Sequence, residues 1–193
     1  MKKHIIPAVK LTLLSILLLA VLYPMLVWGI AQISDGSGKG QTIEDKEKKY
    51  YLNVGQSFTQ DKYFWSRPSA VDYNASGSGG SNKGPSNKEY LNEVQSRIDT
   101  FMLHNPGIKK SEIPVDMITA SASGLDPDFS VQAARVQVKR IAKIRNLNEA
   151  SLEKLINDNV EKPFLGIFGP EKINVLKLNM ALDQLSNNSY SIR

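Results

Sequence analysis

The sequence predicts an α+β protein with a single N-terminal transmembrane helix followed by one soluble extracytoplasmic α+β domain. Three observations predict this class. One long apolar run lies at residues 11–34, aromatic and β-branched residues gather at 50–70, and apolar residues recur at helical spacing beyond residue 88. A chain of 193 residues suits one domain better than two. We therefore expect residues 35–193 to share one core.

The apolar run "LTLLSILLLAVLYPMLVWGIAQIS" (11–34) contains no charged residue. As an α-helix it would be roughly 36 Å long, enough to cross a hydrocarbon layer of about 30 Å. A cleaved signal peptide is the alternative, but its apolar core would be about 7–15 residues and would end at a small-x-small site. The run has no Ala-x-Ala, which favours a retained transmembrane helix. Pro24 should deprive the carbonyl of Ala20 of its helical donor and kink the helix.

The flanking charges predict the orientation of this helix. Lys2, Lys3 and Lys10 precede it, and positive residues tend to stay in the cytoplasm. Residues 39–49 also carry lysines, but acidic residues are mixed with them. We expect residues 1–10 to be cytoplasmic and residues 35–193 to lie outside the cell membrane.

The composition excludes several classes of function. The formal net charge is +5, and without the three lysines before the membrane the charge is nearly balanced, which does not indicate nucleic-acid binding. The absence of cysteine excludes thiol nucleophiles, disulfides and a lipoprotein anchor. The two histidines, His4 and His104, are too few for a multi-histidine metal site. We expect no metal.

The first half of the outer domain should begin with a polar, Gly-rich connector at 35–49. Aromatic and β-branched residues predict short strands over Tyr50–Ala70. Ser86 and Glu89 have the spacing of a capping box, and the helix that follows should end at "NPG" (105–107).

The second half predicts mainly helices. A strand is expected in "EIPVDMITAS" (112–121), where apolar residues alternate. Ser130 is the expected N-cap of a helix to about Arg145, and a second helix follows near Glu149–Val160. The stretch "KPFLGIFGP" (162–170) predicts a turn-rich break. The last apolar residues, near 173–185, fit a helix, with a short strand as the alternative.

The stretch "NASGSGGSNKGPSN" (74–87) has three interpretations: a flexible linker, a phosphate-binding loop, or an ordered loop within one domain. Gly79 and Gly84 have the separation of a Walker A loop, but Pro85 stands in place of its lysine. Asn82 stands in place of the third glycine of a dinucleotide fingerprint. These mismatches favour the ordered loop, since glycines permit tight backbone geometry.

Other polar clusters have both a chemical and a structural interpretation. Asp126 and Asp128 could form an acid/base pair or a calcium site, although Asp before Pro commonly starts a turn. Tyr63, Phe64 and Trp65 could stack on a ligand, although aromatic runs usually pack in the core. A group of cations could bind an anion or complement a helix C-terminus: Lys139, Arg140, Lys143 and Arg145. No catalytic set is evident, so we do not expect an enzyme.

Seven short motifs, in order, carry a resemblance that covers nearly the whole chain. They are "YP" (23–24), "GQSF" (55–58), "YFWSRPSA" (63–70), "SGGSNKGPSN" (78–87), "TASASGLDP" (119–127), "QAARVQVKRIAKIRNL" (132–147) and "INVLKLNMALDQL" (173–185). In this order they resemble the KdpC family, the C subunit of the Kdp-type potassium-transporting ATPase. The residues Val131, Gln132 and Lys139 depart from its pattern, and the C-terminal "SNNSYSIR" lies outside it.

The resemblance implies a non-catalytic accessory subunit of a high-affinity, ATP-driven potassium uptake complex. Its partners would be a pore-type potassium subunit and a P-type ATPase subunit. The chain lacks the Asp-Lys-Thr-Gly-Thr phosphorylation motif, so it is not the ATPase subunit itself. The family is described as a catalytic chaperone that raises the ATP affinity of that subunit. ATP would then be met only through the complex. The implied nucleotide contacts are Ser78, Gly79, Gly80, Ser81, Asn82 and Gln137.

The predicted topology favours a different role. If residues 35–193 are outside, the Gly-rich loop and Gln137 lie where ATP is scarce. A scaffold that docks over the outer mouth of the pore subunit, and stabilises the assembly, suits that placement better. The alternative from another class is a membrane-anchored extracytoplasmic binding module that acts without the pump.

Overall fold

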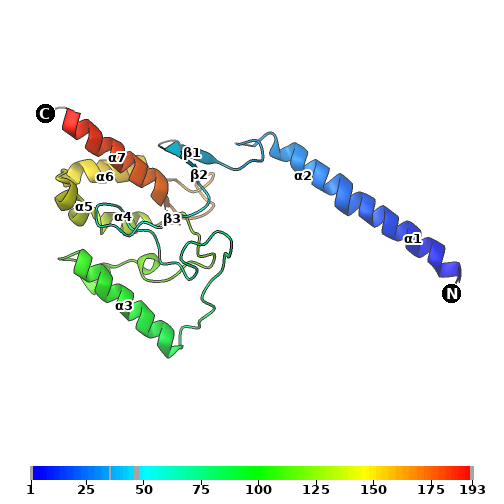
Figure 1. The fold of residues 1–193 in the computed structure, drawn as a ribbon, viewed down its shortest axis with the longest axis horizontal. Coiled ribbons are helices and arrows are strands. Elements are labelled where there is room, and N and C mark those ends of the chain that lie inside the picture. The colour runs from blue at the N-terminus through cyan, green and yellow to red at the C-terminus, as the bar shows by residue number, and fades with distance from the viewer. Residues whose placement is uncertain (1, 35, 46–47, 192–193) are drawn as a thin grey trace.

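The computed structural model describes residues 2–34, 36–45 and 48–191 and confirms the α+β class. A long N-terminal helix leads into a smaller body of helices, irregular segments and two short sheets (Figure 1). The elements run in the order α1 (Lys2–Ile16), η1 (Leu17–Leu22), α2 (Tyr23–Ala31), β1 (Thr42–Asp45), β2 (Lys48–Tyr51), α3 (Lys88–His104), η2 (Lys110–Glu112), η3 (Val115–Met117), β3 (Asp128–Phe129), α4 (Val131–Arg135), α5 (Val138–Arg145), α6 (Glu149–Asp158), β4 (Ile173–Asn174) and α7 (Val175–Ser191).

The N-terminal helix is long and apolar enough to cross a membrane. It runs from Lys3 to Ala31, 29 residues, with no part of its most apolar stretch buried inside the protein. At about 1.5 Å per residue this gives roughly 43 Å, more than the thickness of a bilayer core. Large apolar side chains such as Leu19 and Trp28 are exposed along it, as they are on a helix that lipid surrounds.

Pro24 coincides with an irregularity of this helix. The segment η1, just before it, is π-helical, and the Tyr23 N–H donates to the carbonyl of Leu18, five residues back. A wider turn shifts the carbonyl pairing by one residue, which compensates for the donor that proline lacks. The chain thus continues as one helix into α2.

The region expected to be a connector contains regular structure. Strands β1 and β2 form an antiparallel hairpin in which Thr42 lies opposite Tyr51. The connector assigned to residues 35–49 is thus partly sheet. Conversely, the strands predicted over Tyr50–Ala70 were wrong beyond Tyr51, where the described chain is irregular.

Side chains take the place of a partner strand in the irregular part of Tyr50–Ala70. The Phe64 N–H donates to Oδ1 of Asn179 at 2.9 Å, and the Trp65 N–H donates to Oε1 of Gln137 at 2.7 Å. These bonds satisfy buried backbone groups that a sheet would otherwise pair. Of the aromatic run at 63–65, Phe64 is fully buried and Tyr63 and Trp65 are partly buried against the core, but none of them lies in a strand.

Helix α3 confirms the predicted helix, but its cap is different from the one expected. The Asn87 side chain, not that of Ser86, accepts the N–H of Tyr90 at 3.0 Å. Asn87 has an extended backbone (φ −71°, ψ 118°), as an N-cap requires. The helix stops at Asn105, within the "NPG" turn, as predicted.

The strand predicted over 112–121 was wrong. The chain forms two 3₁₀ turns, η2 and η3, on either side of Pro114. Ile113 and Met117 are buried while Val115 is 67% exposed, so the alternating apolar residues do not share one buried face as they would in a strand. Pro114 cannot donate to a sheet, which disfavours a central strand here.

The helix expected from Ser130 to Arg145 is interrupted. Ser130 is its N-cap, as predicted, and its Oγ accepts the N–H of Ala133 at 3.1 Å. The helix then divides into α4 and α5, with Gln137 at the junction. Beyond α6, the last segment contains both expected structures: β4 pairs antiparallel with β3, and α7 follows directly.

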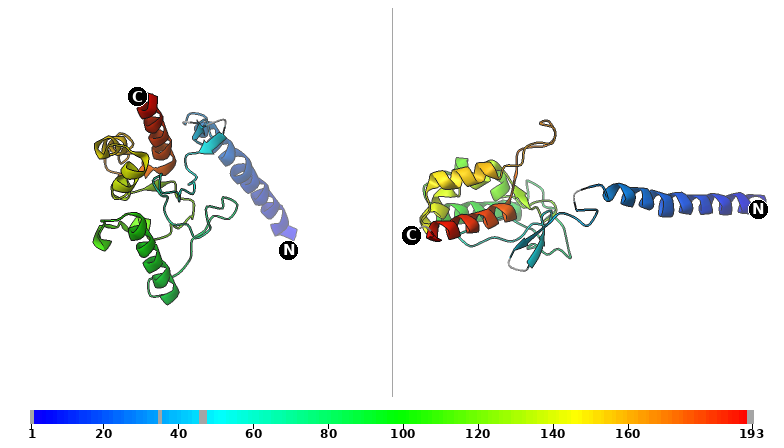
Figure 2. Two further views of the ribbon diagram at one scale, coloured as in Figure 1. Left: turned by 60° about the vertical axis from the view of Figure 1, so that its left-hand side comes forward. Right: turned by 90° about the horizontal axis from the view of Figure 1, so that it is seen from above.

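The core lies where α4 to α7 pack together, with α3 on one side, as the two views in Figure 2 show. Its fully buried side chains include Phe64 from the irregular segment, Ile141 from α5, Leu152 from α6, and Leu178 from α7. The predicted apolar faces of these helices are thus confirmed as core faces.

The cap of α3 gives a first testable prediction. Asn87→Ala removes a side-chain acceptor from the first turn and should lower the free energy of unfolding by about 1 kcal/mol. Ser86→Ala is the matched control and should stay within about 0.5 kcal/mol. Thermal unfolding of the full chain in detergent, followed by circular dichroism, compares the two. A larger decrease in unfolding free energy for Ser86→Ala than for Asn87→Ala would contradict the assignment of Asn87 as the N-cap.

Candidate functional site

Gln137 lies inside the domain, at the break between α4 and α5, and is 0% exposed. Its Oε1 accepts from the Trp65 N–H at 2.7 Å and from Nη2 of Arg140 at 2.6 Å. Its Nε2 donates to the carbonyl of Ala133 at 2.9 Å. Because these bonds engage both ends of the amide, Gln137 presents no exposed polar atom to a ligand.

Arg140 is the centre of the same polar network. Its Nε donates to Oδ1 of Asn105 at 2.9 Å, and Nη1 donates to the carbonyls of Tyr63, at 3.1 Å, and of Asp61. Its guanidinium also stacks over the Trp65 ring, 4.8 Å from the ring centroid. One side chain thus joins the irregular 61–65 segment to α3 and α5.

The charge of Arg140 is deeply buried, since its side chain is only 2% exposed. Burial lowers the pKa of the guanidinium to about 10, and the carboxylate of Asp61, at 3.8 Å, opposes this shift. Arg140 therefore remains a cation at neutral pH. A buried charge is tolerated only where hydrogen bonds and an opposite charge surround it, which is what these contacts supply.

The Gly-rich loop lies against the 121–125 turn. The Gly79 N–H donates to the carbonyl of Ser123 at 2.8 Å, and the Ser78 hydroxyl donates to the same oxygen at 3.0 Å. On the other side of that turn, the Ser69 hydroxyl donates to the carbonyl of Gly124 at 2.7 Å. These contacts fit an ordered loop within one domain and do not fit a flexible linker.

Close backbone approach explains why small residues are needed here. A Cβ on Gly80 would lie 3.0 Å from the carbonyl oxygen of Ala122. At Gly124, whose φ is +68°, a Cβ would lie 2.4 Å from Cγ2 of Val71. Gly84, in contrast, has nothing within 4 Å. The glycines that matter for packing are thus the ones where the two loops touch.

The two parts of the implied nucleotide site have different hydrogen-bond partners. Gln137 bonds to Trp65, Ala133 and Arg140, whereas Ser78 and Gly79 bond to Ser123. Of the other loop residues in the implied site, Gly80 is half-buried and Ser81 and Asn82 are exposed, and Asn82 has a left-handed backbone with φ +53°.

A cleft of about 430 Å³ lies between α3 and residues 57–73. Trp65 and His104 both line it and their rings are in contact, with centroids 4.9 Å apart. Its two guanidinium groups are already engaged: Arg67 pairs with Asp126 at 2.5 Å, and Arg97 donates to the carbonyl of Ile118 at 3.1 Å. The cleft is therefore mainly an apolar, aromatic surface.

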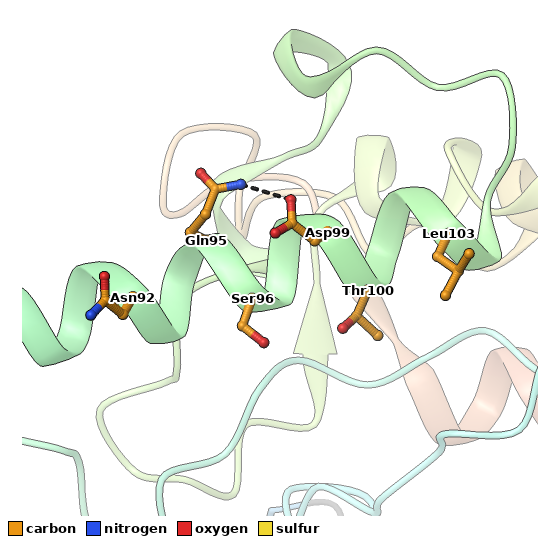
Figure 3. A pocket seen from close by; sticks show the side chains of 6 residues that line it. All are labelled: Asn92, Gln95, Ser96, Asp99, Thr100 and Leu103. Carbon is orange, nitrogen blue, oxygen red and sulfur yellow. Dashed lines mark hydrogen bonds between the residues drawn. The ribbon is translucent and has the colours of Figure 1, made fainter.

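The outer face of α3 borders a second hollow, shown in Figure 3. Six side chains line it, and all of them come from this one helix: Asn92, Gln95, Ser96, Asp99, Thr100 and Leu103. Gln95 donates to Asp99 one turn further along, at 2.7 Å. Without a second wall, this hollow is a polar helix surface and not a binding pocket.

The other candidate residues have structural partners. Asp126 pairs with Arg67, and Asp128 pairs with Lys172 at 2.5 Å, so each carboxylate of the pair is neutralised by a cation. Within the described residues, no group of three or more metal-ligating side chains occurs. Of the four cations near the end of α5, Arg140 points inward and Arg145 bonds to Asp183 at 2.7 Å.

The role of Arg140 was missed in the sequence, where it was grouped with three other cations that could bind an anion or complement a helix C-terminus. The sequence did contain a signal that Arg140 is buried. Gln137 and Arg140 are three residues apart and so lie on the same side of a helix, among the apolar residues Val138 and Ile141. Polar residues inside an apolar face indicate a buried network, which must be satisfied internally.

Together these features define a class: a small α+β domain on a single helix able to span a membrane, with its candidate reactive groups engaged internally. Residues 5–184 match the family described as "KdpC: K+-transporting ATPase, c chain". The chain belongs to the KdpC family.

Individual relatives agree with this assignment. The Potassium-transporting ATPase KdpC subunit of Flavobacterium johnsoniae is 53% identical over 184 residues, covering 95% of this chain and 99% of the relative. That of Bacteroides fragilis is 47% identical over 190 residues, with 96% and 99% covered. That of Caldanaerobacter subterraneus subsp. tengcongensis is 44% identical over 184 residues, with 94% and 95% covered.

The contact between the two loops gives a second prediction. Gly124→Ala forces a side chain into a left-handed backbone and against Val71, and should cost about 2–4 kcal/mol of unfolding free energy. Gly84→Ala, in open space, should stay within about 0.5 kcal/mol of the parent or be slightly stabilising. Urea unfolding of the full chain measures both. Equal, small effects would instead indicate a flexible linker.

Removal of the buried cation gives a third prediction. Arg140→Met leaves the Asn105 side chain and two carbonyls without their donor, and should cost about 3–5 kcal/mol. Lys139 is the exposed residue next to Arg140. Lys139→Met is therefore the control and should change the unfolding free energy by less than about 0.5 kcal/mol. The two variants are compared by urea unfolding in detergent. A similar small effect of both would mean that the network does not hold the domain together.

Proposed function

We propose that this chain is a non-catalytic accessory subunit of a potassium-transporting ATPase complex for high-affinity uptake. The N-terminal helix holds it in the cell membrane, with residues 1–10 inside and residues 35–193 outside. The outer domain docks on the pore-type subunit, and the chain assembles with the P-type ATPase subunit, so that it stabilises the complex. Membership of the KdpC family supports this assignment, since the relatives are named as subunits of such an ATPase.

One observation carries the choice of a docking role. Three of the groups that could serve a reaction or bind a nucleotide are engaged by other groups of the domain: Gln137 with Arg140, Asp126 with Arg67, and Asp128 with Lys172. Because these groups already have partners inside the domain, its surface, and not a reactive centre, is what it offers to other proteins.

A chaperone role through direct ATP contact is the finer alternative. It would need Gln137 to leave its three internal bonds, whereas Ser81 and Asn82 are exposed as they stand. The hydrogen bonds of Gln137 therefore favour docking. In the docking role, Ser81→Ala and Asn82→Ala leave the KM for ATP of the assembled complex unchanged. A raised KM at normal assembly would support nucleotide contact instead.

The orientation can be tested by thiol labelling, because the chain has no cysteine. Ser76→Cys and Ser96→Cys place thiols at exposed positions of the outer domain, and His4→Cys places one before the helix. We expect a membrane-impermeant maleimide to label the first two in intact cells, and His4→Cys only after permeabilisation. The reverse pattern would overturn the proposed orientation.

The assembly itself can be tested by purifying the tagged full chain from its native membrane in mild detergent. We expect a P-type ATPase and a pore subunit to be recovered with it, with potassium-stimulated ATP hydrolysis. This activity should fall when the chain is stripped from the complex. A chain recovered alone, without that activity, would instead support an anchored binding module that acts without the pump.

A further inference from the structure

The loop between α6 and β4 is an ordered hairpin with an apolar end. At its base, Glu161 and Lys172 exchange backbone hydrogen bonds of 2.8 and 3.1 Å. Nearer the end, Phe164 and Phe168 exchange two more, both 3.0 Å. We call residues 164–168 the apolar tip. Because two sets of reciprocal bonds close the loop, the tip has a defined shape.

The large side chains of the apolar tip face away from the domain. The exposed fractions are 72% for Phe164, 74% for Leu165, 75% for Ile167 and 60% for Phe168. Single exposed apolar residues are normal on a protein surface, but four in five consecutive positions form a patch. Such a patch indicates a surface that is covered when the protein is in its working state.

The backbone of the tip adds a second observation. Leu165 has φ +54° and Gly166 has φ +76°, which places a bulky side chain in the left-handed region. This conformation is unfavourable for leucine. No burial inside the domain offsets this backbone strain, because the Leu165 side chain is mostly exposed. The turn thus holds an apolar side chain outward at a cost in stability.

The charges at the base of the hairpin help to identify what covers the tip. Lys172 pairs with Asp128 at 2.5 Å, and Lys177 pairs with Glu161 at 2.9 Å. The exposed residues Lys162 and Glu171 carry opposite charges. The base therefore lacks the excess of positive charge that attracts a loop to an anionic lipid surface. A rigid aromatic tip on a neutral base suits an apolar protein pocket.

The direction of the hairpin agrees with this choice. In the right-hand view of Figure 2, the segment between α6 and β4 projects from the body across the direction of the N-terminal helix. If that helix crosses the membrane, the tip extends sideways over the membrane surface. Its natural contact is then a neighbouring membrane protein and not the lipid beneath its own anchor.

We propose that the apolar tip docks into an apolar pocket on the extramembrane surface of a membrane-spanning partner subunit beside the anchor helix. This inference rests on the proposed function, because it requires such a partner. It adds the contact element: Phe164 and Ile167 are the anchoring side chains, and the paired backbone of the hairpin keeps them in place before the partner binds, which lowers the entropy cost of docking.

Photo-crosslinking in native membranes tests the contact directly. In Ile167→p-benzoyl-phenylalanine, illumination should yield an adduct with a membrane-spanning subunit that mass spectrometry identifies. Leu103→p-benzoyl-phenylalanine is the control, since Leu103 is 78% exposed but lies on α3. We expect no adduct from it with that subunit. An adduct of Ile167 only with lipid, only with a second copy of this chain, or with nothing would overturn the proposal.

A pair of serine variants separates this proposal from the proposed function. Ile167→Ser should reduce the recovery of partner subunits about ten-fold or more in mild detergent, as expected for an anchoring residue. Leu103→Ser should leave recovery unchanged, and neither variant should lower the unfolding temperature. If Ile167→Ser recovers the partners as well as the parent does, the tip proposal fails while the accessory role stands. If the parent chain recovers no partner, both fail.

Discussion

The domain depends on one constraint: the buried cation of Arg140 must be surrounded by acceptors. The acceptors come from the 61–65 segment, from Asn105 at the end of α3, and from Gln137 at the α4–α5 break. Satisfying a single guanidinium therefore fixes three parts of the chain relative to one another. It also places Phe64, which is fully buried, in the centre of the core although it belongs to no strand or helix.

A second constraint, close backbone packing, shapes the contact between the Gly-rich loop and the 121–125 turn. Gly80 and Gly124 let two loops approach closely: a Cβ would crowd the Ala122 carbonyl at Gly80 and clash with Val71 at Gly124. Together, the polar network and the loop contact leave few groups free for chemistry. What remains for interaction is surface, above all the hairpin that carries Phe164 and Ile167 outward. An anchored subunit that acts by docking would have this combination of internally paired charges and an apolar projection.

Local signals predicted the helices well, because an amphipathic helix is specified by neighbours along the chain. The cap at Ser130 and the break at the "NPG" turn were confirmed for the same reason. The strands expected in Tyr50–Ala70 and in 112–121 were not, because apolar alternation requires burial on one side but does not supply a partner strand. Asn179 and Gln137 supply the missing backbone partners in the first case.

The sequence by itself determined the helix able to span a membrane, the α+β class and the family. These follow from run length, helical periodicity and the order of short motifs, all of which are local or collinear properties of the chain. Only the tertiary structure decided that Gln137 and Arg140 are internal and that the 164–168 tip is exposed. Burial depends on contacts between residues far apart in the chain, such as Arg140 with Tyr63, and no local pattern specifies these contacts.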